Sequence, residues 1–380
     1  MCGIIGIVTS QRRTLIPNII RSLRDLEYRG YDSAGIGFIA DGKIKTYTCL
    51  GAPSEQLHAE DVYQKTHTLN RKITTIIGHN RWATHGKPSL KNAHPHTDCT
   101  KRIALVHNGT ILNFETLKKE LEKNGHSFRS DTDTEVIAHV IEEYLKTTDS
   151  FEKAFRATLA QLEGSFGIVA IDKESPQHLY VAKNGSPLNI GITPNTFIIA
   201  SSVNALLRYT KEYVSLTDKE YAILSAQDNI MHQEFFDINQ QKAVTKHIQH
   251  IEGVNVDNLS KGDFDSYMRK EIYEQPATTR TTMLGRYDLK TGDTVLGGLL
   301  DFDSFFKNIR HMYITGCGTA YNAGVVGRHV IEYLTNIQVR NEIASEFKYQ
   351  NYTLPPKETA VFAISQSGET ADTLEAIKEI

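Results

Sequence analysis

The pattern of apolar residues changes near residue 250, and this change constrains the fold more than any other feature of the chain. Before it, short β-branched runs are frequent and helical patterns are few, which is typical of an α+β domain with two stacked sheets covered by helices. After it, strand and helix patterns alternate, which indicates a doubly wound parallel sheet. We therefore predict domains at 1–247 and 263–380, joined by a polar linker at 248–262.

The composition indicates a soluble globular protein whose partners are small molecules. The chain has 380 residues, 40% of them hydrophobic, and a formal net charge of −3. It therefore has no global bias toward nucleic acid or an anionic membrane surface. We find no apolar run of about 18 residues and no N-terminal secretion signal, so a cytoplasmic location is the default expectation.

Apolar spacing also predicts the individual elements. Helices are expected at residues 15–26, 114–123, 134–145 and 151–162. Strands are expected at 34–40, 43–49, 74–78, 103–107, 165–171, 179–182, 188–192, 197–200 and 221–224. The second domain is expected to begin with a helix at 264–284 that is interrupted at Pro276. Its strands at 312–315, 339–343 and 361–364 would alternate with helices at 321–334 and 370–380, the last of which has no cap, so this domain looks incomplete.

Cys2 directly follows Met1 and precedes a β-branched run that we interpret as a buried strand. If Met1 is removed, Cys2 carries both a thiol and a free α-amine, whose reference pKa of about 7.7–8.0 lets it accept a proton near neutral pH. Such a residue can act as a nucleophile without a histidine base. The alternative is that Cys2 is only a small apolar residue that begins a strand.

Two polar sequences follow predicted strands of the first domain. Arg81 can hold a carboxylate with two hydrogen bonds, and the large ring of Trp82 can form one wall of a binding pocket. The alternative is that Arg81 is a surface cation and Trp82 its packing partner. Asn108-Gly109 is by default a turn, but it can also supply two donors to an oxyanion.

Asp131 and Asp133 lie just ahead of the helix predicted at 134–145. One of these two acids is expected to cap that helix, because aspartate is among the preferred N-cap residues. The other can face the ammonium group of a ligand.

A metal site is not predicted. The four cysteines, which we expect to be reduced thiols, form no CxxC pair: Cys2, Cys49, Cys99 and Cys317. Five histidines crowd one region of the sequence: His79, His85, His94, His96 and His107. They lack the helical spacing of a zinc protease. We expect them to order loops by hydrogen bonding.

Six sequence blocks together resemble the N-terminal-nucleophile glutamine amidotransferases, whose fold is an αββα four-layer sandwich. The blocks begin at Cys2, Leu26, Arg81, Asn92, His107 and Asp131. The resemblance implies that Cys2 attacks the glutamine side-chain amide and that Asn108 and Gly109 form the oxyanion hole. It also implies a set of glutamine-binding residues: Arg81 for the carboxylate, Asp133 for the ammonium, Thr84 and His85 to complete the pocket, and Trp82 at its exit.

Two loops of the second domain follow predicted parallel strands, where such folds bind ligands. Residues 316–319 and 365–370 offer hydroxyls and helix N-terminal amides suited to phosphate, although each alone could be an ordinary strand-to-helix turn. Neither a full dinucleotide motif nor a Walker lysine is present. The loop at 365–370 resembles the phosphosugar loop of sugar isomerase (SIS) domains. That resemblance implies five contacts to a sugar phosphate: Thr319, Ser365, Gln366, Ser367 and Thr370.

The whole chain resembles the glutamine–fructose-6-phosphate aminotransferases. The resemblance implies transfer of the amide nitrogen of L-glutamine to D-fructose 6-phosphate, which gives D-glucosamine 6-phosphate and L-glutamate without a cofactor, in a homodimer. The second isomerase lobe and the C-terminal tail of that family are missing, so we expect this chain to retain only glutamine hydrolysis. Two alternatives stay open, a phosphoribosylpyrophosphate amidotransferase and a non-catalytic phosphosugar-binding regulator.

Overall fold

The computed structural model describes residues 2–13, 15–68, 73–83, 86–227, 230–240, 242–251, 262–288, 290–347, 349–350, 355–366, 368 and 370–379. The chain forms two compact units, Met1–Gly262 and Asp263–Ile380. Within the described ranges, no helix combines the length and the apolar character that crossing a membrane requires.

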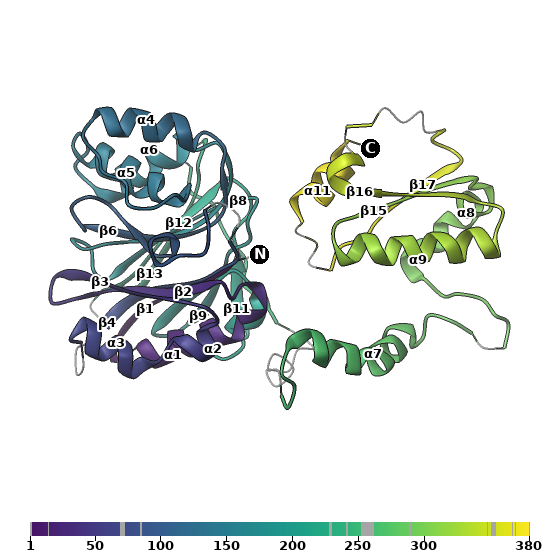
Figure 1. Cartoon of the computed structure of the whole chain (residues 1–380), viewed down its shortest axis with the longest axis horizontal. Coiled ribbons are helices and arrows are strands. Elements are labelled where there is room, and N and C mark those ends of the chain that lie inside the picture. The colour runs from purple at the N-terminus through teal and green to yellow at the C-terminus, as the bar shows by residue number, and fades with distance from the viewer. Residues whose placement is uncertain are drawn as a thin grey trace. The chain divides into compact units, whose positions relative to one another are not determined.

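The first unit contains two antiparallel sheets (Figure 1). The eight-stranded sheet has the order β14-β11-β9-β10-β1-β4-β2-β3. Its strands are β1 (Gly3–Arg13), β2 (Ser33–Ala40), β3 (Lys43–Leu50), β4 (Ile73–Arg81), β9 (Asn189–Thr193), β10 (Thr196–Ala200), β11 (Glu212–Ser215) and β14 (Gln249–His250).

The six-stranded sheet has the order β13-β12-β8-β7-β6-β5. Its strands are β5 (His96–Thr97), β6 (Ile103–Ile111), β7 (Gly164–Asp172), β8 (His178–Asn184), β12 (Glu220–Gln227) and β13 (Ile230–Asp237). Strand β6 pairs with β7 along its whole length, from Ile103 opposite Asp172 to Ile111 opposite Gly164.

Helices cover the outer face of each sheet, so the unit has four layers (Figure 1). One helical layer holds α1 (Ile16–Asp25), α2 (Pro53–Gln56) and α3 (Ala59–Thr66), and the other holds α4 (Phe114–Lys123), α5 (Thr134–Leu145) and α6 (Phe151–Gln161). Short 3-10 segments lie at Glu27–Arg29, Leu90–Asn92 and Val203–Leu206. This arrangement is the predicted αββα sandwich.

Three apolar cores hold the layers together, and strand alternation explains their separation. On β1, Ile5 and Ile7 pack against the α1–α3 layer, whereas Ile4 and Val8 point into the core between the two sheets. The third core lies between the six-stranded sheet and α4–α6. Strand β1 is therefore buried on both faces, and its N-terminal end is fixed between the two sheets.

The turn at Asp41-Gly42 forms as predicted. Both residues have positive φ, 54° and 67°, which is the conformation that a two-residue hairpin with a primed turn requires. The prediction of a turn at Asn108-Gly109 is wrong, because β6 continues through both residues to Ile111. Continued pairing with β7 supplies backbone hydrogen bonds that a local turn cannot, and it overrides the Asn-Gly preference.

The second unit contains a three-stranded parallel sheet in the order β16-β15-β17. Its strands are β15 (His311–Gly316), β16 (Gln338–Ile343) and β17 (Thr359–Ala363). Its helices are α7 (Tyr267–Met283), α8 (Asp303–Asn308), α9 (Thr319–Leu334), α10 (Ala344–Phe347) and α11 (Ala371–Lys378), with a 3-10 segment at Gly297–Phe302. Strand and helix alternate as predicted for an SIS-type sheet.

Helix α7 differs from its prediction, because it runs through Pro276 without interruption. Proline lacks the N–H that would bond to the preceding turn and crowds the carbonyl of that turn, but the helical turns on either side of Pro276 keep the helix continuous. Ser266 caps the start of this helix by accepting from the Arg269 amide at 3.2 Å.

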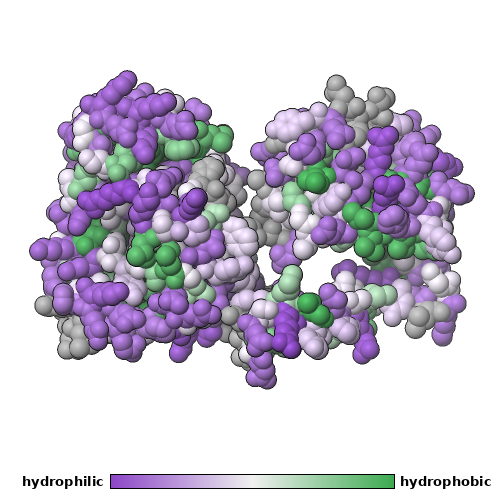
Figure 2. Space-filling view, in the orientation of Figure 1, coloured by the Kyte–Doolittle hydropathy of each residue, from purple (hydrophilic) through white to green (hydrophobic). Residues whose placement is uncertain are grey.

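The visible surface is mostly hydrophilic, with apolar groups scattered over both units (Figure 2). On α9, however, four large apolar side chains are at least half exposed: Val326, Val330, Tyr333 and Leu334. An exposed apolar stripe of this kind on one helix is typical of a surface that packs against another element.

Candidate active site

Cys2 lies at the N-terminal end of β1, between the two sheets. The β1–β4 register places Gly3 opposite Asn80, which brings Cys2 beside Arg81 and Trp82. The Trp82 amide donates to Cys2 Sγ at 3.2 Å, and the Sγ lies 3.4 Å from the Trp82 carbonyl oxygen. Burial raises the pKa of the Cys2 thiol, although the Trp82 backbone and nearby positive charge oppose the shift. The thiol is therefore neutral at pH 7 and needs a base to become a nucleophile.

Asn108 reaches the same point from the other sheet. Its Nδ2 donates to the Cys2 carbonyl oxygen at 3.0 Å, and its Oδ1 lies 3.0 Å from His79 Nε2. Since Asn108 Oδ1 can only accept, His79 must carry its proton on Nε2. This bond fixes the orientation of the amide, so the Asn108 donor is held beside Cys2.

The backbone around Gly109 leaves no room for a side chain at this position. Its φ is +127°, and a Cβ at this position would lie 2.1 Å from the Ser165 carbonyl oxygen. The glycine therefore lets β6 approach β7 closely while it lines the cavity beside the thiol. A continuous strand, and not a turn, positions Asn108 and Gly109.

A small cavity of about 30 Å³ borders the Cys2 thiol. Besides Cys2 and Gly109 it is lined by Arg81, Trp82, His94, His107, Thr132, Asp133 and Thr134. Arg81 is 4% exposed and Asp133 6%, so a guanidinium and a carboxylate meet in one buried space. Arg81 Nη2 donates to the Gly86 carbonyl oxygen at 3.1 Å. The other two predicted pocket residues, Thr84 and His85, lie outside the described residues.

The two aspartates ahead of α5 do not cap it through their side chains, which corrects the prediction. Asp133 occupies the N-cap position, but its Oδ2 accepts from the Ile111 amide at 2.8 Å. Asp131 pairs with Lys91 at 2.7 Å on the surface. Long-range partners thus compete with local capping, and the bond to Ile111 turns the Asp133 carboxylate toward the β6 end of the cavity.

Four of the five clustered histidines form a buried layer beneath the cavity. The His79 and His94 rings stack at 4.0 Å between centroids, and His94 lies 4.8 Å from His96. Burial lowers the pKa of His79 to about 3 and that of His96 to about 4. Neutral rings bond as predicted: His107 Nδ1 to Thr134 Oγ1 at 3.0 Å, and His96 Nε2 to Thr132 Oγ1 at 3.1 Å.

Arg29 is a site residue that the sequence did not reveal. Its Nε donates to the Cys2 carbonyl oxygen at 3.1 Å, so this oxygen is held from two sides. Arg29 belongs to the block 26–35 that carries the family resemblance. That block was the only sequence signal for it, because nothing in the spacing of Arg29 from Cys2 indicates contact.

The second unit brings the two predicted phosphate loops together. Thr319 begins α9 after β15, and Thr370 stands at the N-cap position of α11 after β17. The Ile364 amide donates to the Thr315 carbonyl at 2.8 Å, so the loops leave adjacent strands at the same edge. Ser365 Oγ accepts from the Gly368 amide at 3.0 Å, and Gln366 is exposed. Ser367 lies outside the described residues.

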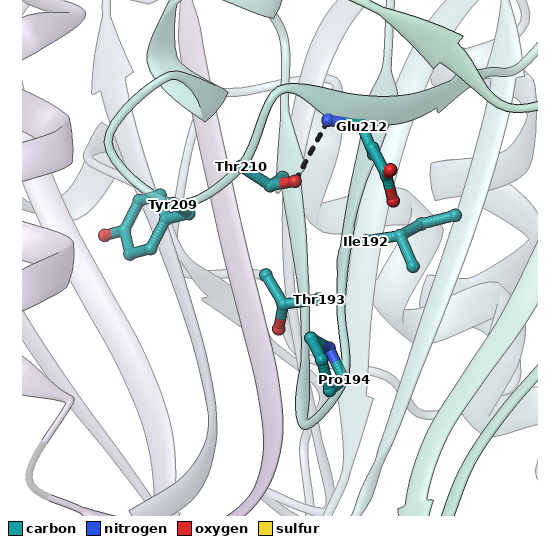
Figure 3. Close-up of a pocket in the computed structure, with 6 residues that line it drawn as sticks. All are labelled: Ile192, Thr193, Pro194, Tyr209, Thr210 and Glu212. Atoms are coloured by element: carbon teal, nitrogen blue, oxygen red, sulfur yellow. Dashed lines mark hydrogen bonds between the residues drawn. The ribbon is translucent and has the colours of Figure 1, made fainter.

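A different hollow, of about 380 Å³, lies at the β9–β10 hairpin (Figure 3). It is lined by Ile192, Thr193, Pro194, Tyr209, Thr210 and Glu212. The Thr210 hydroxyl accepts from the Glu212 amide at 2.9 Å. None of the predicted site residues lines this hollow, so we assign it no part in the chemistry at Cys2.

One family match lies within each unit. Residues 79–208 match a glutamine amidotransferase domain and residues 305–380 match the SIS domain. The chain is 42% identical over 381 residues to the glutamine–fructose-6-phosphate aminotransferase [isomerizing] of Pyrococcus horikoshii, covering 100% of this chain and 60% of that protein. The protein of the same name from Chlorobaculum tepidum is 39% identical over 380 residues, with the same two coverages, 100% and 60%. The chain thus spans about 60% of the length of these curated relatives.

Solved structures resemble the chain over 61% of its length. The glutamine phosphoribosylpyrophosphate amidotransferase from B. subtilis, complexed with ADP and GMP, has a TM-score of 0.50 and 27% identity and is covered over 49% of its chain. A structure described as the allosteric regulatory enzyme of purine biosynthesis has a TM-score of 0.52 and 26% identity, and 48% of it is covered. These likenesses and the family matches confirm the predicted fold class.

Proposed function

We propose that this chain belongs to the glutamine–fructose-6-phosphate aminotransferase family and releases the amide nitrogen of L-glutamine at Cys2. In the aminotransferase reaction that we propose, this nitrogen passes to D-fructose 6-phosphate, which gives D-glucosamine 6-phosphate and L-glutamate. One observation carries the proposal: Cys2, Arg81, Gly109 and Asp133 line one cavity, and the Asn108 amide donates to the Cys2 carbonyl oxygen beside it.

The reaction begins with proton transfer. After removal of Met1, the α-amine of Cys2 takes the thiol proton, and Sγ attacks the side-chain carbonyl carbon of glutamine. The resulting oxyanion accepts hydrogen bonds from Asn108 Nδ2 and the Gly109 N–H. When the C–N bond breaks, the ammonium of Cys2 returns its proton to the leaving nitrogen, which departs as ammonia. Water then cleaves the thioester to glutamate and restores the thiol.

Arg81 and Asp133 select an α-amino acid in this scheme. Glutamine carries a carboxylate and an ammonium on one carbon, and the two side chains offer the complementary charges. Both are almost fully buried, so their attraction to the substrate is screened less by salt than a surface contact. Trp82, which is 43% exposed and packs edge-on to Tyr31 at 5.5 Å, stands at the cavity mouth in this proposal.

The second unit supplies the acceptor site in this proposal. The hydroxyls of Thr319, Ser365, Ser367 and Thr370 and the Gln366 amide bind the phosphate and sugar, and no cofactor takes part. A phosphoribosylpyrophosphate amidotransferase is disfavoured, because the second unit matches an SIS domain. We also propose a cytoplasmic homodimer, with no nucleic acid partner; the exposed apolar side chains of α9 support a packing surface on this unit.

The proposal is tested by intact mass spectrometry before and after incubation with diazo-oxo-norleucine, an electrophilic glutamine mimic. The expected result is a chain without Met1 that takes up a single adduct, located on Cys2. The unlabelled chain should release glutamate from glutamine, and the labelled chain should not. A chain that retains Met1, or one that matures but takes up no label, would favour the non-catalytic regulator instead.

Asn108→Ala is expected to lower kcat for glutamine hydrolysis by about 10²–10³-fold, which is the usual effect of removing one oxyanion donor. KM should change much less, because the ground-state amide oxygen depends less on this donor. His79→Ala is the matched comparison: it removes the group that orients Asn108, so kcat should fall by a smaller factor. Steady-state kinetics decides, and an unchanged kcat for Asn108→Ala would remove Asn108 from the oxyanion site.

A further inference from the structure

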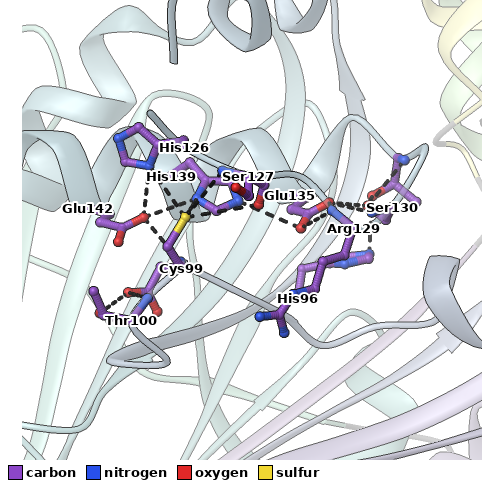
Figure 4. Close-up of polar contacts among 12 residues, drawn as sticks. His96, Cys99, Thr100, His126, Ser127, Arg129, Ser130, Glu135, His139 and Glu142 are labelled. Atoms are coloured by element: carbon purple, nitrogen blue, oxygen red, sulfur yellow. Dashed lines mark hydrogen bonds and ion pairs between the residues drawn. The ribbon is translucent and has the colours of Figure 1, made fainter. Parts of the chain in front are cut away.

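Four metal-ligating side chains from three segments of the first unit converge away from the glutamine cavity (Figure 4). Cys99 lies between β5 and β6, His126 follows α4, and His139 and Glu142 stand one turn apart on α5. Their ligand atoms all lie within 4.8 Å of one another. We propose that they bind one divalent zinc ion in a closed, structural site.

The distances match a tetrahedral site. Cys99 Sγ lies 3.9 Å from His126 Nδ1 and 3.6 Å from His139 Nδ1. Glu142 Oε2 lies 2.9 Å and 3.1 Å from the same two nitrogens. Zinc–ligand bonds of about 2.0–2.3 Å give tetrahedral edges of about 3.6 Å between sulfur and nitrogen and about 3.3 Å between nitrogen and oxygen. These four distances therefore differ from the tetrahedral edges by only a few tenths of an ångström.

A carboxylate lies behind each imidazole, within hydrogen-bond distance for His126 and as a longer ionic contact for His139. His126 Nε2 lies 2.6 Å from Glu143 Oε2, and His139 Nε2 lies 3.6 Å from Glu135 Oε1. A carboxylate behind a ligating histidine fixes the ring and makes the ligating nitrogen more basic. Both rings turn Nδ1 toward Cys99 and Glu142 and Nε2 toward a carboxylate, which is the orientation that two histidines binding one ion require.

The donor set and its exposure indicate which ion fits. A thiolate with two imidazoles and one carboxylate suits zinc, whereas magnesium and calcium prefer oxygen ligands alone. The histidines are 7% and 1% exposed, but Cys99 is exposed, so the ion has a path from solvent. Four protein ligands leave no open position for a substrate, which is the pattern of a structural and not a catalytic zinc.

A zinc ion at this site would stabilise a segment that lines the cavity beside Cys2. Glu135, behind His139, accepts from the Arg129 and Ser130 amides at 2.9 Å and 2.7 Å. These residues lead into the 132–134 segment that lines the cavity. Zinc at this point joins α5, the loop after α4 and the loop after β5, so it should stabilise the loop that carries Asp133.

The test uses the full 380-residue chain, purified in reductant. We expect about one zinc per chain by elemental analysis, and cobalt added to the chelator-treated chain should give a thiolate charge-transfer band and strong tetrahedral visible bands. Cys99→Ala should lose both signals, while Cys317→Ala, the matched thiol control, keeps them. Glu143→Gln, which removes the support behind His126, should weaken zinc binding by about 10–100-fold.

Two results would overturn the site. One is a wild-type chain that binds no more zinc than Cys99→Ala, which would leave only a hydrogen-bonded cluster. The other is a cobalt spectrum without the thiolate band, which can be recorded on the wild type even if a variant fails to fold. Because glutamine hydrolysis is measured separately, loss of the metal signal does not test the chemistry proposed at Cys2.

Discussion

Replacing Cys2 by alanine is expected to lower kcat for glutamine hydrolysis by a factor on the order of 10⁴ or more, as for other covalent nucleophiles. The sulfur forms the covalent bond in the proposed reaction, and no neighbouring group can take its place in the thioester. Cys2→Ser should lose nearly as much, because a serine hydroxyl is far harder to deprotonate than a thiol. Release of glutamate at saturating glutamine measures the effect, and Cys49→Ala is the thiol control that should keep the wild-type rate.

A variant whose mature chain keeps one residue ahead of Cys2 separates the two proposed functions of Cys2, which are the nucleophile and the base. It keeps the thiol but replaces the α-amine by a peptide nitrogen, which cannot accept the proton. Since burial raises the pKa of the thiol, loss of the base should lower kcat by about 10²–10⁴-fold. If Cys2→Ala kept a substantial fraction of the wild-type rate, the nucleophile would have to lie elsewhere. If the extended chain stayed as active as the wild type while Cys2→Ala lost its activity, the amine would not be the base.

The first unit should lose stability steeply in mild acid. Burial holds the pKa of His79 near 3 and that of His96 near 4, against 6.5 in the unfolded chain. Below pH 6.5 the unfolded state therefore binds more protons than the folded state, so the free energy of unfolding falls with falling pH. The two residues together should lower it by about 5 kcal/mol between about pH 7.5 and pH 4.5. That is comparable to the whole stability of many domains.

Other groups change the size of this effect but not its direction. Burial also lowers the pKa of His94 and His107, which adds to the loss. Glu135, with a pKa lowered to about 2, adds a further loss only below its unfolded value of 4.5. The pKa of His139 is raised by Glu135 and Glu142 against its burial. Its contribution is present below pH 6.5 and is lost as pH rises, so it opposes the others weakly.

Urea unfolding at several pH values, with metal chelated throughout, measures this dependence. His79→Gln removes one titrating group while it keeps an amide that can reach Asn108, and it should reduce the loss by about 2–3 kcal/mol over the same pH range. His232→Asn, an exposed control on β13, should leave the dependence unchanged. Equal slopes for the wild type and His79→Gln would show that His79 is not held neutral by burial.

Much of the fold could be predicted because the elements of the first unit carry strong periodic patterns. Helices α4 and α5 have the predicted bounds, and α6 ends one residue before its prediction. The hairpin at Asp41-Gly42 follows from local backbone preference. The errors occurred where long-range pairing overrides a local preference: β6 runs through Asn108-Gly109, and Asp133 bonds to Ile111 instead of capping α5.

The sequence by itself predicted a division into two units and the position of Cys2 at the start of a buried strand, and its ordered blocks indicated candidate residues for a site at the thiol. These features depend on local periodicity or on chain order, which a sequence contains directly. Only the tertiary structure decided which distant residues touch. Arg29 beside the Cys2 carbonyl, and Cys99 beside His126, His139 and Glu142, are contacts of this kind. Packing of separate layers creates them, because no spacing along the chain encodes a distance across a fold.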